Sequence, residues 1–107
     1  MAREMDRERI YVIGSRETVL GFSLVGVPGR VPSSGEELME LLRERYDDPG
    51  MALILVEEGL AEQARPLLDE LLARRGFPLI VEIPGREGPL PRRGIKEFIA
   101  GAIGVRL

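Results

Sequence analysis

The fold is set by the stretch Ile10-Tyr11-Val12-Ile13-Gly14-Ser15-Arg16-Glu17-Thr18-Val19-Leu20-Gly21-Phe22-Ser23-Leu24-Val25-Gly26. Four consecutive apolar residues, Ile10 to Ile13, are typical of a strand that is buried on both faces of a parallel sheet. After Gly14 the apolar residues change to helical spacing, which predicts a short helix over residues 17–24. A buried strand that leads into a helix is the first half of a β-α-β unit.

Three further segments have the composition of strands. Residues 51–56, Met-Ala-Leu-Ile-Leu-Val, form the longest apolar run and predict a second central strand. Residues 77–83 predict another strand, which ends at Pro84-Gly85. Residues 25–32 contain two prolines, and proline removes a donor from the ladder, so a strand here belongs at an edge of the sheet.

A helix with a well-marked start is predicted before the second central strand. Ser34 and Glu37 have the spacing of a capping box, in which two side chains satisfy free amides at a helix start. Residues 38–46 then carry apolar side chains at helical spacing. The turn sequence Asp-Asp-Pro-Gly at residues 47–50 ends this helix.

The next helical segment is interrupted by Pro66. A proline deep inside a helix costs about 3 kcal/mol, whereas a proline in the first turn costs little. We therefore expect a short turn from Gly59 and a main helix that begins near Arg65 or Pro66. This main helix should end at residues 74–76, Arg-Arg-Gly.

The last predicted element is a helix over about residues 92–104 with one apolar stripe. Gly94, Gly101 and Gly104 each weaken a helix interior by about 0.8 to 1 kcal/mol relative to alanine. Such a helix must be stabilised by docking against another surface. The stripe consists of Ile95, Phe98, Ile99, Ala102 and Ile103.

The alternation of strands and helices predicts a parallel sheet with right-handed crossovers. We expect a three-layer, receiver-like (flavodoxin-like) α/β fold with strand order 2-1-3-4 and an additional C-terminal helix. This order puts two crossovers on one face of the sheet and only the helix at residues 17–24 on the other. A strand as apolar as residues 51–56 does not leave that second face in water.

We therefore hypothesise that the C-terminal helix covers the second face or leaves it to bind a partner. Fast amide exchange in the free protein that slows when a partner binds would support this hypothesis. Uniform protection from residue 92 onward in the free protein would contradict it.

Composition argues against several functional classes. The 107 residues include no cysteine and no histidine, so thiol chemistry, disulfides and the most common metal ligand are absent. A net charge of -3 with mixed signs gives no basic surface for nucleic acid. No apolar stretch approaches the roughly 18 residues that suggest a membrane span. We expect a cytosolic, single-domain protein without a cofactor, a metal or direct membrane insertion.

Tests for specific chemistry favour structural explanations. A receiver domain needs paired acids after its first strand and an aspartate after its third, but Gly14-Ser15-Arg16-Glu17 and Glu57-Glu58 stand at these places. The glycines match neither a Walker loop nor the spacing of a dinucleotide site. We interpret Glu57 and Glu58 as a solvated strand exit and Ser15 as an N-cap of the first helix, because no histidine is present to activate the serine.

The order of several motifs resembles one known family. Three consecutive motifs resemble the opening of the F subunit of V-type or A-type ATP synthases. They are Tyr11-Val12-Ile13-Gly14, Thr18-Val19-Leu20-Gly21-Phe22 and Leu24-Val25-Gly26. Further matches are residues 52–58 (ALILVEE), 78–85 (PLIVEIPG) and 99–105 (IAGAIGV). The resemblance covers residues 10–107 in the right order. The charged segment at residues 1–9 is longer than the family usually carries, and Pro66 is a second departure.

The resemblance implies a non-catalytic rotor subunit in the central stalk of a rotary ATPase. Members bind the coiled-coil stalk subunit (the D subunit). They help to couple ATP hydrolysis or synthesis in the catalytic head to proton or sodium transport. The other implied partners are the catalytic head and the connector to the membrane ring. By this resemblance the protein would be cytoplasmic and peripheral to the membrane, with a mobile C-terminal helix. The implied partner-binding residues are Arg93, Ile95, Lys96, Phe98, Ile99, Ala102 and Ile103.

The expected organisation is a charged tail at residues 1–9, a sheet domain at 10–85, and a loop with the C-terminal helix at 86–107. Two other classes stay open. A free-standing receiver-like adapter would bind another partner without phosphorelay chemistry. A small enzyme would have to rely on carboxylates alone.

Overall fold

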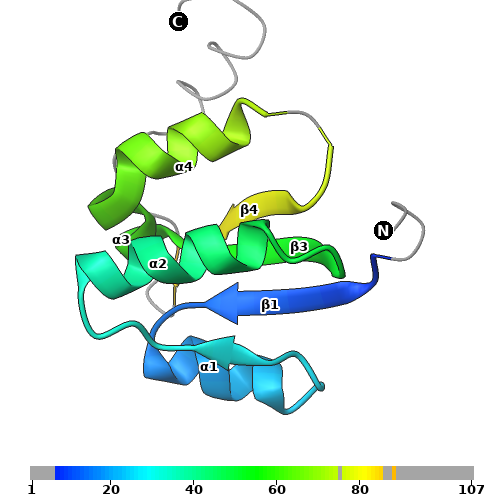
Figure 1. The fold of residues 1–107 in the computed structure, drawn as a ribbon. Coiled ribbons are helices and arrows are strands. Elements are labelled where there is room, and N and C mark those ends of the chain that lie inside the picture. The colour runs from blue at the N-terminus through cyan, green and yellow to red at the C-terminus, as the bar shows by residue number, and fades with distance from the viewer. Residues whose placement is uncertain (1–6, 75, 86–87, 89–107) are drawn as a thin grey trace, which may run out of the picture.

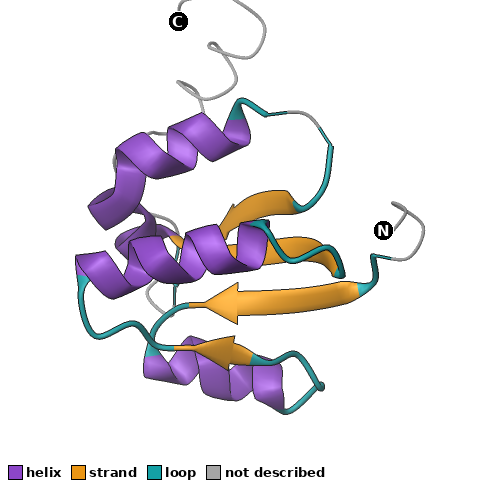
Figure 2. Cartoon of the chain, in the orientation of Figure 1, coloured by secondary structure: helices purple, strands orange, loops and turns teal. Residues whose placement is uncertain are grey.

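The computed structural model describes residues 7–74, 76–85 and 88 of the chain (Figures 1 and 2). Four strands form one parallel sheet in the order β2-β1-β3-β4. The predicted α/β fold class and strand order are therefore confirmed. The strands are β1 (Arg9–Ile13), β2 (Gly29–Arg30), β3 (Met51–Glu57) and β4 (Leu79–Ile83).

Helices form the crossovers between the strands. Figure 1 shows α2 in front of the sheet, α4 above β4 and α1 behind β2. The connection from β1 to β2 runs toward one edge of the sheet and the later connections run toward the other, so right-handed crossovers place α1 opposite α2 and α4. The helical elements are α1 (Arg16–Ser23), α2 (Gly35–Tyr46), α3 (Glu58–Ala61), the short 3-10 helix η2 (Glu62–Ala64) and α4 (Arg65–Leu72).

Pro66 divides the segment after β3 in the way the sequence predicts. The chain forms the single turn of α3 and then η2, and α4 starts at Arg65 with the proline in its first turn. At this position the missing N–H of proline removes no helical hydrogen bond. The helix ends at Leu72, two residues before the predicted end.

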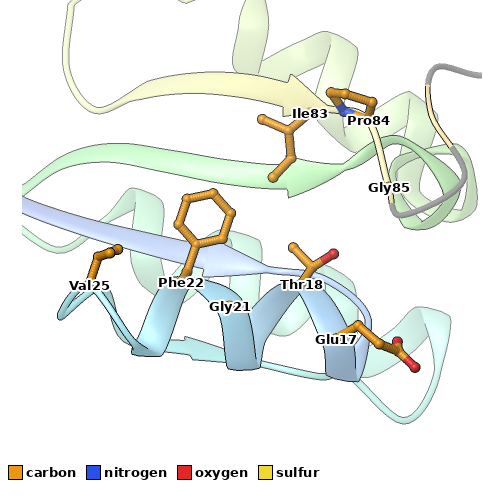
Figure 3. A pocket seen from close by; sticks show the side chains of 8 residues that line it. All are labelled: Glu17, Thr18, Gly21, Phe22, Val25, Ile83, Pro84 and Gly85. Atoms are coloured by element: carbon orange, nitrogen blue, oxygen red, sulfur yellow. The ribbon is translucent and has the colours of Figure 1, made fainter.

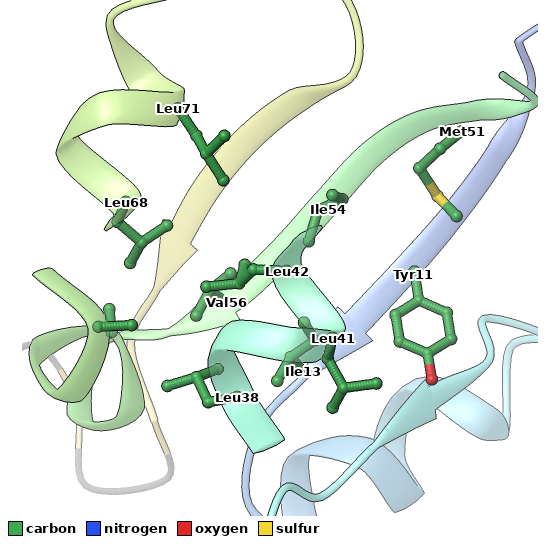
Figure 4. Packing of buried hydrophobic residues seen from close by; sticks show 12 residues of the cluster. Tyr11, Ile13, Leu38, Leu41, Leu42, Met51, Ile54, Val56, Leu68 and Leu71 are labelled. Atoms are coloured by element: carbon green, nitrogen blue, oxygen red, sulfur yellow. The ribbon is translucent and has the colours of Figure 1, made fainter. Parts of the chain in front are cut away.

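The hydrophobic core lies between the sheet and the helices α2, α3, η2 and α4. We call this side of the sheet the covered face; Ile13, Ile54 and Val56 point to it and are fully buried. Leu38, Leu42 and Leu68 pack against these strands from α2 and α4, as Figure 4 shows. The alternation of Tyr11 and Ile13 with Val12 places consecutive β1 residues on opposite faces.

The edge strand β2 is shorter than the predicted segment 25–32. It contains only two residues, and Val25 lies in the turn after α1 with a 76% exposed side chain. A Cβ atom on Gly29 would lie 2.4 Å from Val12 Cγ1, so the two strands approach too closely for any larger residue. β4 likewise begins at Leu79, two residues later than predicted.

The structure describes part of the predicted N-terminal tail but none of the predicted C-terminal helix. β1 begins at Arg9, and the amides of Glu8 and Arg9 donate to Gly50 O at 3.3 and 3.2 Å. Arg7 also donates from its guanidinium to Met51 O at 3.1 Å. The last three residues of the predicted tail thus contact the start of β3. The rest of that tail and the predicted helix at residues 92–104 lie outside the described residues.

Candidate functional site

The side of the sheet opposite α2 and α4 is only partly covered, and we call it the open face. Leu79 on β4 is 53% exposed, Val81 is 44% exposed, and Ile10 on β1 is 37% exposed. Parity along the strands assigns these residues to the face away from the core cluster. The strand residues of the open face are Ile10, Val12, Leu53, Leu55, Leu79, Val81 and Ile83.

A groove lies on the open face between α1 and the end of β4 (Figure 3). In Figure 3, Phe22 and Thr18 rise from α1 toward the sheet and Ile83 points down toward Phe22. The lining is mainly apolar, and Glu17 stands at one end of the groove. The lining residues are Glu17, Thr18, Gly21, Phe22, Val25, Ile83, Pro84 and Gly85.

Helix α1 is poorly buried for an element of its composition. None of its eight residues, all of which the structure describes, is fully buried, and Leu20 is 61% exposed. Leu24 and Val25, which follow the helix, are 81% and 76% exposed. Of these three exposed side chains, only Val25 is among the residues that line the groove.

Glu57, the last residue of β3, connects this helix to the sheet. Its Oε1 accepts a hydrogen bond from Ser15 N at 3.0 Å and another from Ser15 Oγ at 2.9 Å. The Ser15 hydroxyl also lies 3.2 Å from Thr18 Oγ1. Burial raises the pKa of Glu57, but hydrogen bonds from Thr18 and Ser15 outweigh this effect and leave the pKa below its ordinary value.

These contacts correct two interpretations made from the sequence. Glu57 is a half-buried acceptor and not a solvated strand exit. Ser15 does occupy the N-cap position of α1, but its side chain makes no capping bond and binds Glu57 instead. At α2 the serine half of the predicted capping box is confirmed, because Ser34 Oγ accepts from Glu37 N at 3.1 Å. The Glu37 carboxylate accepts from the Ser33 hydroxyl at 2.7 Å.

On the covered face a second half-buried glutamate has a different role. Glu82 on β4 receives two hydrogen bonds from the Arg65 guanidinium, both of 2.7 Å. Arg65 also pairs with Glu62 and, at 3.6 Å, with Asp69. The hydrogen bonds from Arg65 lower the pKa of Glu82, although burial acts in the opposite direction. This cluster joins α4 to β4 and lies away from the groove.

The described part of the chain contains no group of three or more histidine, cysteine, aspartate or glutamate residues placed to hold a metal ion. Among the described helices, none combines the length and the apolar composition that crossing a bilayer requires. The mainly apolar lining of the groove suits apolar contact.

The structure and the sequence point to different candidate residues. The groove itself was not predicted, although Gly21 and Phe22 stood in the motif that carried the family resemblance. Its other wall comes from the end of β4, and only the fold brings Ile83 opposite Phe22. The residues predicted to bind a partner all lie outside the described residues; they are Arg93, Ile95, Lys96, Phe98, Ile99, Ala102 and Ile103.

A parallel sheet of order 2-1-3-4, with one covered face and an apolar groove on the other, defines a small flavodoxin-like α/β domain. The chain belongs to the family of the ATP synthase (F/14-kDa) subunit, whose sequence profile matches residues 10–100. This finding confirms the family resemblance that the sequence motifs indicated.

Named relatives agree with this assignment. The chain is 35% identical over 101 residues to the F subunit of the A-type ATP synthase of Methanothermobacter thermautotrophicus, and the match covers 92% of this chain and 94% of the relative. It is 33% identical to the F subunit of the A-type ATP synthase of Methanocaldococcus jannaschii, covering 92% and 98%. The F subunit of the V-type ATP synthase of Thermus thermophilus is 35% identical over 74 residues, or 69% of this chain and 71% of the relative.

Proposed function

We propose that this protein is a non-catalytic subunit in the central stalk of an A-type or V-type ATP synthase. In this role it helps to couple ATP hydrolysis or synthesis in the catalytic head, through the connector of the membrane ring, to proton or sodium transport. Family membership and the names of the relatives support the proposal. The structural observation that carries it is the apolar groove on the open face, which suits an apolar protein segment better than a polar substrate.

The proposed partner is the coiled-coil stalk subunit, and the proposed contact is the stripe between residues 93 and 103. In this proposal the protein is cytoplasmic and is held at the membrane only through the ATPase complex. The proposed organisation is a charged segment at residues 1–9, of which Arg9 already begins β1, a sheet domain at residues 10–85, and a segment at residues 86–107 that changes partners.

We further propose that the stripe covers the open face while the chain is free of the coiled-coil stalk subunit. The path of the chain supports this occupant. Pro84 and Gly85 line the groove, and Gly88 N donates to Gly85 O at 2.9 Å, so Gly88, the last described residue, is held next to a residue of the groove. A helix over 13 residues is about 20 Å long. Four strands spaced by about 4.8 Å present a face of comparable width.

Co-expression with the coiled-coil stalk subunit encoded in the same genome, followed by size-exclusion chromatography, tests the assignment. We expect a stoichiometric complex that Phe98→Asp and Ile99→Asp weaken, because each places a charge in an apolar contact. Leu72→Asp is the matched control, since Leu72 is a 44% exposed side chain on α4 on the other side of the molecule. This control variant should bind as the unchanged chain does.

Each other result has a defined meaning. A complex that tolerates both changes in the stripe would keep the assignment but move the contact to the sheet domain. Failure to form a complex at micromolar concentration would contradict the stalk assignment and favour the free-standing adapter.

A further inference from the structure

Glu57 touches both walls of the groove. On the α1 side, its Oε1 accepts from the amide and the hydroxyl of Ser15, at 3.0 and 2.9 Å. These bonds hold the residue directly before the first turn of α1. Thr18, which the Ser15 hydroxyl also contacts, itself lines the groove.

The other carboxylate oxygen of Glu57 lies against the exit of β4. A Cβ atom built on Gly85 would lie 2.7 Å from Glu57 Oε2, and one built on Gly14 would lie 2.9 Å from Oε1. The backbone at both positions therefore packs directly on the carboxylate. Gly85 lines the groove and begins the turn to Gly88, from which residues 89–107 continue.

We propose that Glu57 is a positioning residue that holds α1 and the exit of β4 at a fixed separation and so sets the width of the groove for the C-terminal stripe. This inference rests on the proposed function, because the stripe is the occupant proposed there. One wall of the groove comes from α1, near the start of the described chain, and the other comes from the end of β4, near its end. Glu57 stands between them on the central strand β3, which neighbours both β1 and β4.

The geometry separates this role from a general contribution to stability. Glu82 is also a half-buried strand glutamate with two strong hydrogen bonds, but its partner Arg65 lies on α4 at the covered face. Removing either carboxylate removes charge-assisted hydrogen bonds. If the proposal is correct, removal of the Glu57 carboxylate changes the separation of the two groove walls, and removal of the Glu82 carboxylate does not.

The test compares Glu57→Ala with Glu82→Ala in the full chain. The first readout is the set of NMR signals of the Phe22 ring and the Ile83 methyl groups, which face each other across the groove. The second is amide exchange at residues 95–103. We expect Glu57→Ala to shift the Phe22 and Ile83 signals and to raise exchange at 95–103 by about tenfold. Glu82→Ala should leave both readouts unchanged even where it lowers overall stability.

Two further variants keep the test decisive if Glu57→Ala folds poorly. Glu57→Gln retains the size of the side chain and one acceptor oxygen, so both readouts should fall between those of the unchanged chain and those of the alanine variant. Gly85→Ala disturbs the same contact from the opposite side, because its Cβ would displace Glu57 Oε2. It should reproduce the effects of Glu57→Ala without any change in Glu57.

The outcomes distinguish this inference from the proposed function. If Glu57→Ala leaves the Phe22 and Ile83 signals in place, or if Glu82→Ala shifts them equally, Glu57 has no positioning role. If residues 95–103 exchange in the unchanged chain as an unstructured peptide does, the proposed docking of the stripe is wrong. In that case the Phe22 and Ile83 signals alone still decide whether Glu57 sets the separation of the walls.

Discussion

The two faces of one sheet differ sharply in how well they are covered. On the covered face Ile13, Ile54 and Val56 are fully buried beneath α2 and α4, whereas on the open face Leu79 and Val81 are 53% and 44% exposed. The strands themselves are similarly apolar on both sides. The difference follows from the order 2-1-3-4, because right-handed crossovers place two helical connections on one face and only α1 on the other.

The strand order thus explains why one face of the sheet is left with an apolar groove. The face that α2 and α4 cover contains the core, while the face with α1 alone retains an apolar groove, which we propose is filled by the C-terminal stripe. Several measurements can strengthen or contradict the contrast.

The largest difference is expected for truncation of one strand residue on each face. Ile54→Ala removes a fully buried side chain and should lower the free energy of unfolding by about 2 to 5 kcal/mol. Leu79→Ala removes a 53% exposed side chain and should cost less than about 1 kcal/mol. Urea denaturation of both variants measures the difference. Equal losses would show that the open face is packed in solution as tightly as the covered face.

A smaller effect is expected from the ion pair that fixes α4 to β4. Arg65→Met removes two hydrogen bonds of 2.7 Å to a half-buried carboxylate and should cost about 1.5 to 3 kcal/mol. Arg74→Met is the matched control, because the pair Arg74–Glu70 has side chains that are 50% and 62% exposed. Such surface pairs contribute about 0 to 1 kcal/mol. If the two arginine variants are equally stable, Arg65 does not secure the covered face.

Acid should weaken both faces through their half-buried glutamates. Glu57 and Glu82 have pKa values below the ordinary one in the folded chain, so their ionised forms stabilise the fold above the unfolded pKa, and this contribution is lost as the pH falls through the folded values. Stability should therefore decline as the pH drops below about 4.3, the ordinary value for glutamate. Glu82→Gln should show a shallower decline in thermal unfolding curves. An unchanged slope would mean that Glu82 does not contribute.

The smallest expected effect is a gain in stability on the open face. Gly21 lies inside α1 and lines the groove, and a Cβ built there meets no atom within 4 Å. Gly21→Ala should stabilise the fold by up to about 1 kcal/mol, because alanine is the better helix former. The added methyl group also enters the groove and should raise the exchange of residues 95–103. A stable variant with unchanged exchange would show that the stripe does not occupy this part of the groove.

Much of the fold could be predicted because it depends on local patterns. The apolar runs at residues 10–13 and 51–56 identified the central strands, and Pro66 marked the start of α4 within one residue. The edge strand was predicted too long, since Val25 has the composition of a strand but lies in an exposed turn. Its pairing is limited to Gly29 and Arg30.

The groove and its supporting glutamate could not be predicted in the same way. Ile83 and Phe22 are 61 positions apart in the numbering and meet only through the order of the strands. Glu57 follows an apolar strand, where an acid usually faces water, and its contact with Ser15 spans 42 residues. Sequence motifs indicated the family, but contacts between distant segments required the fold.

The most direct test is amide exchange of the full chain, measured alone and in complex with the coiled-coil stalk subunit. It would show whether the open face and that partner compete for residues 95–103. We expect residues 95–103 in the free chain to exchange faster than α2 but slower than an unstructured peptide, and to become strongly protected in the complex. Exchange in α2, on the covered face, should not change. Uniform strong protection from residue 92 onward in the free chain, or identical exchange at residues 95–103 in both samples, would contradict this competition.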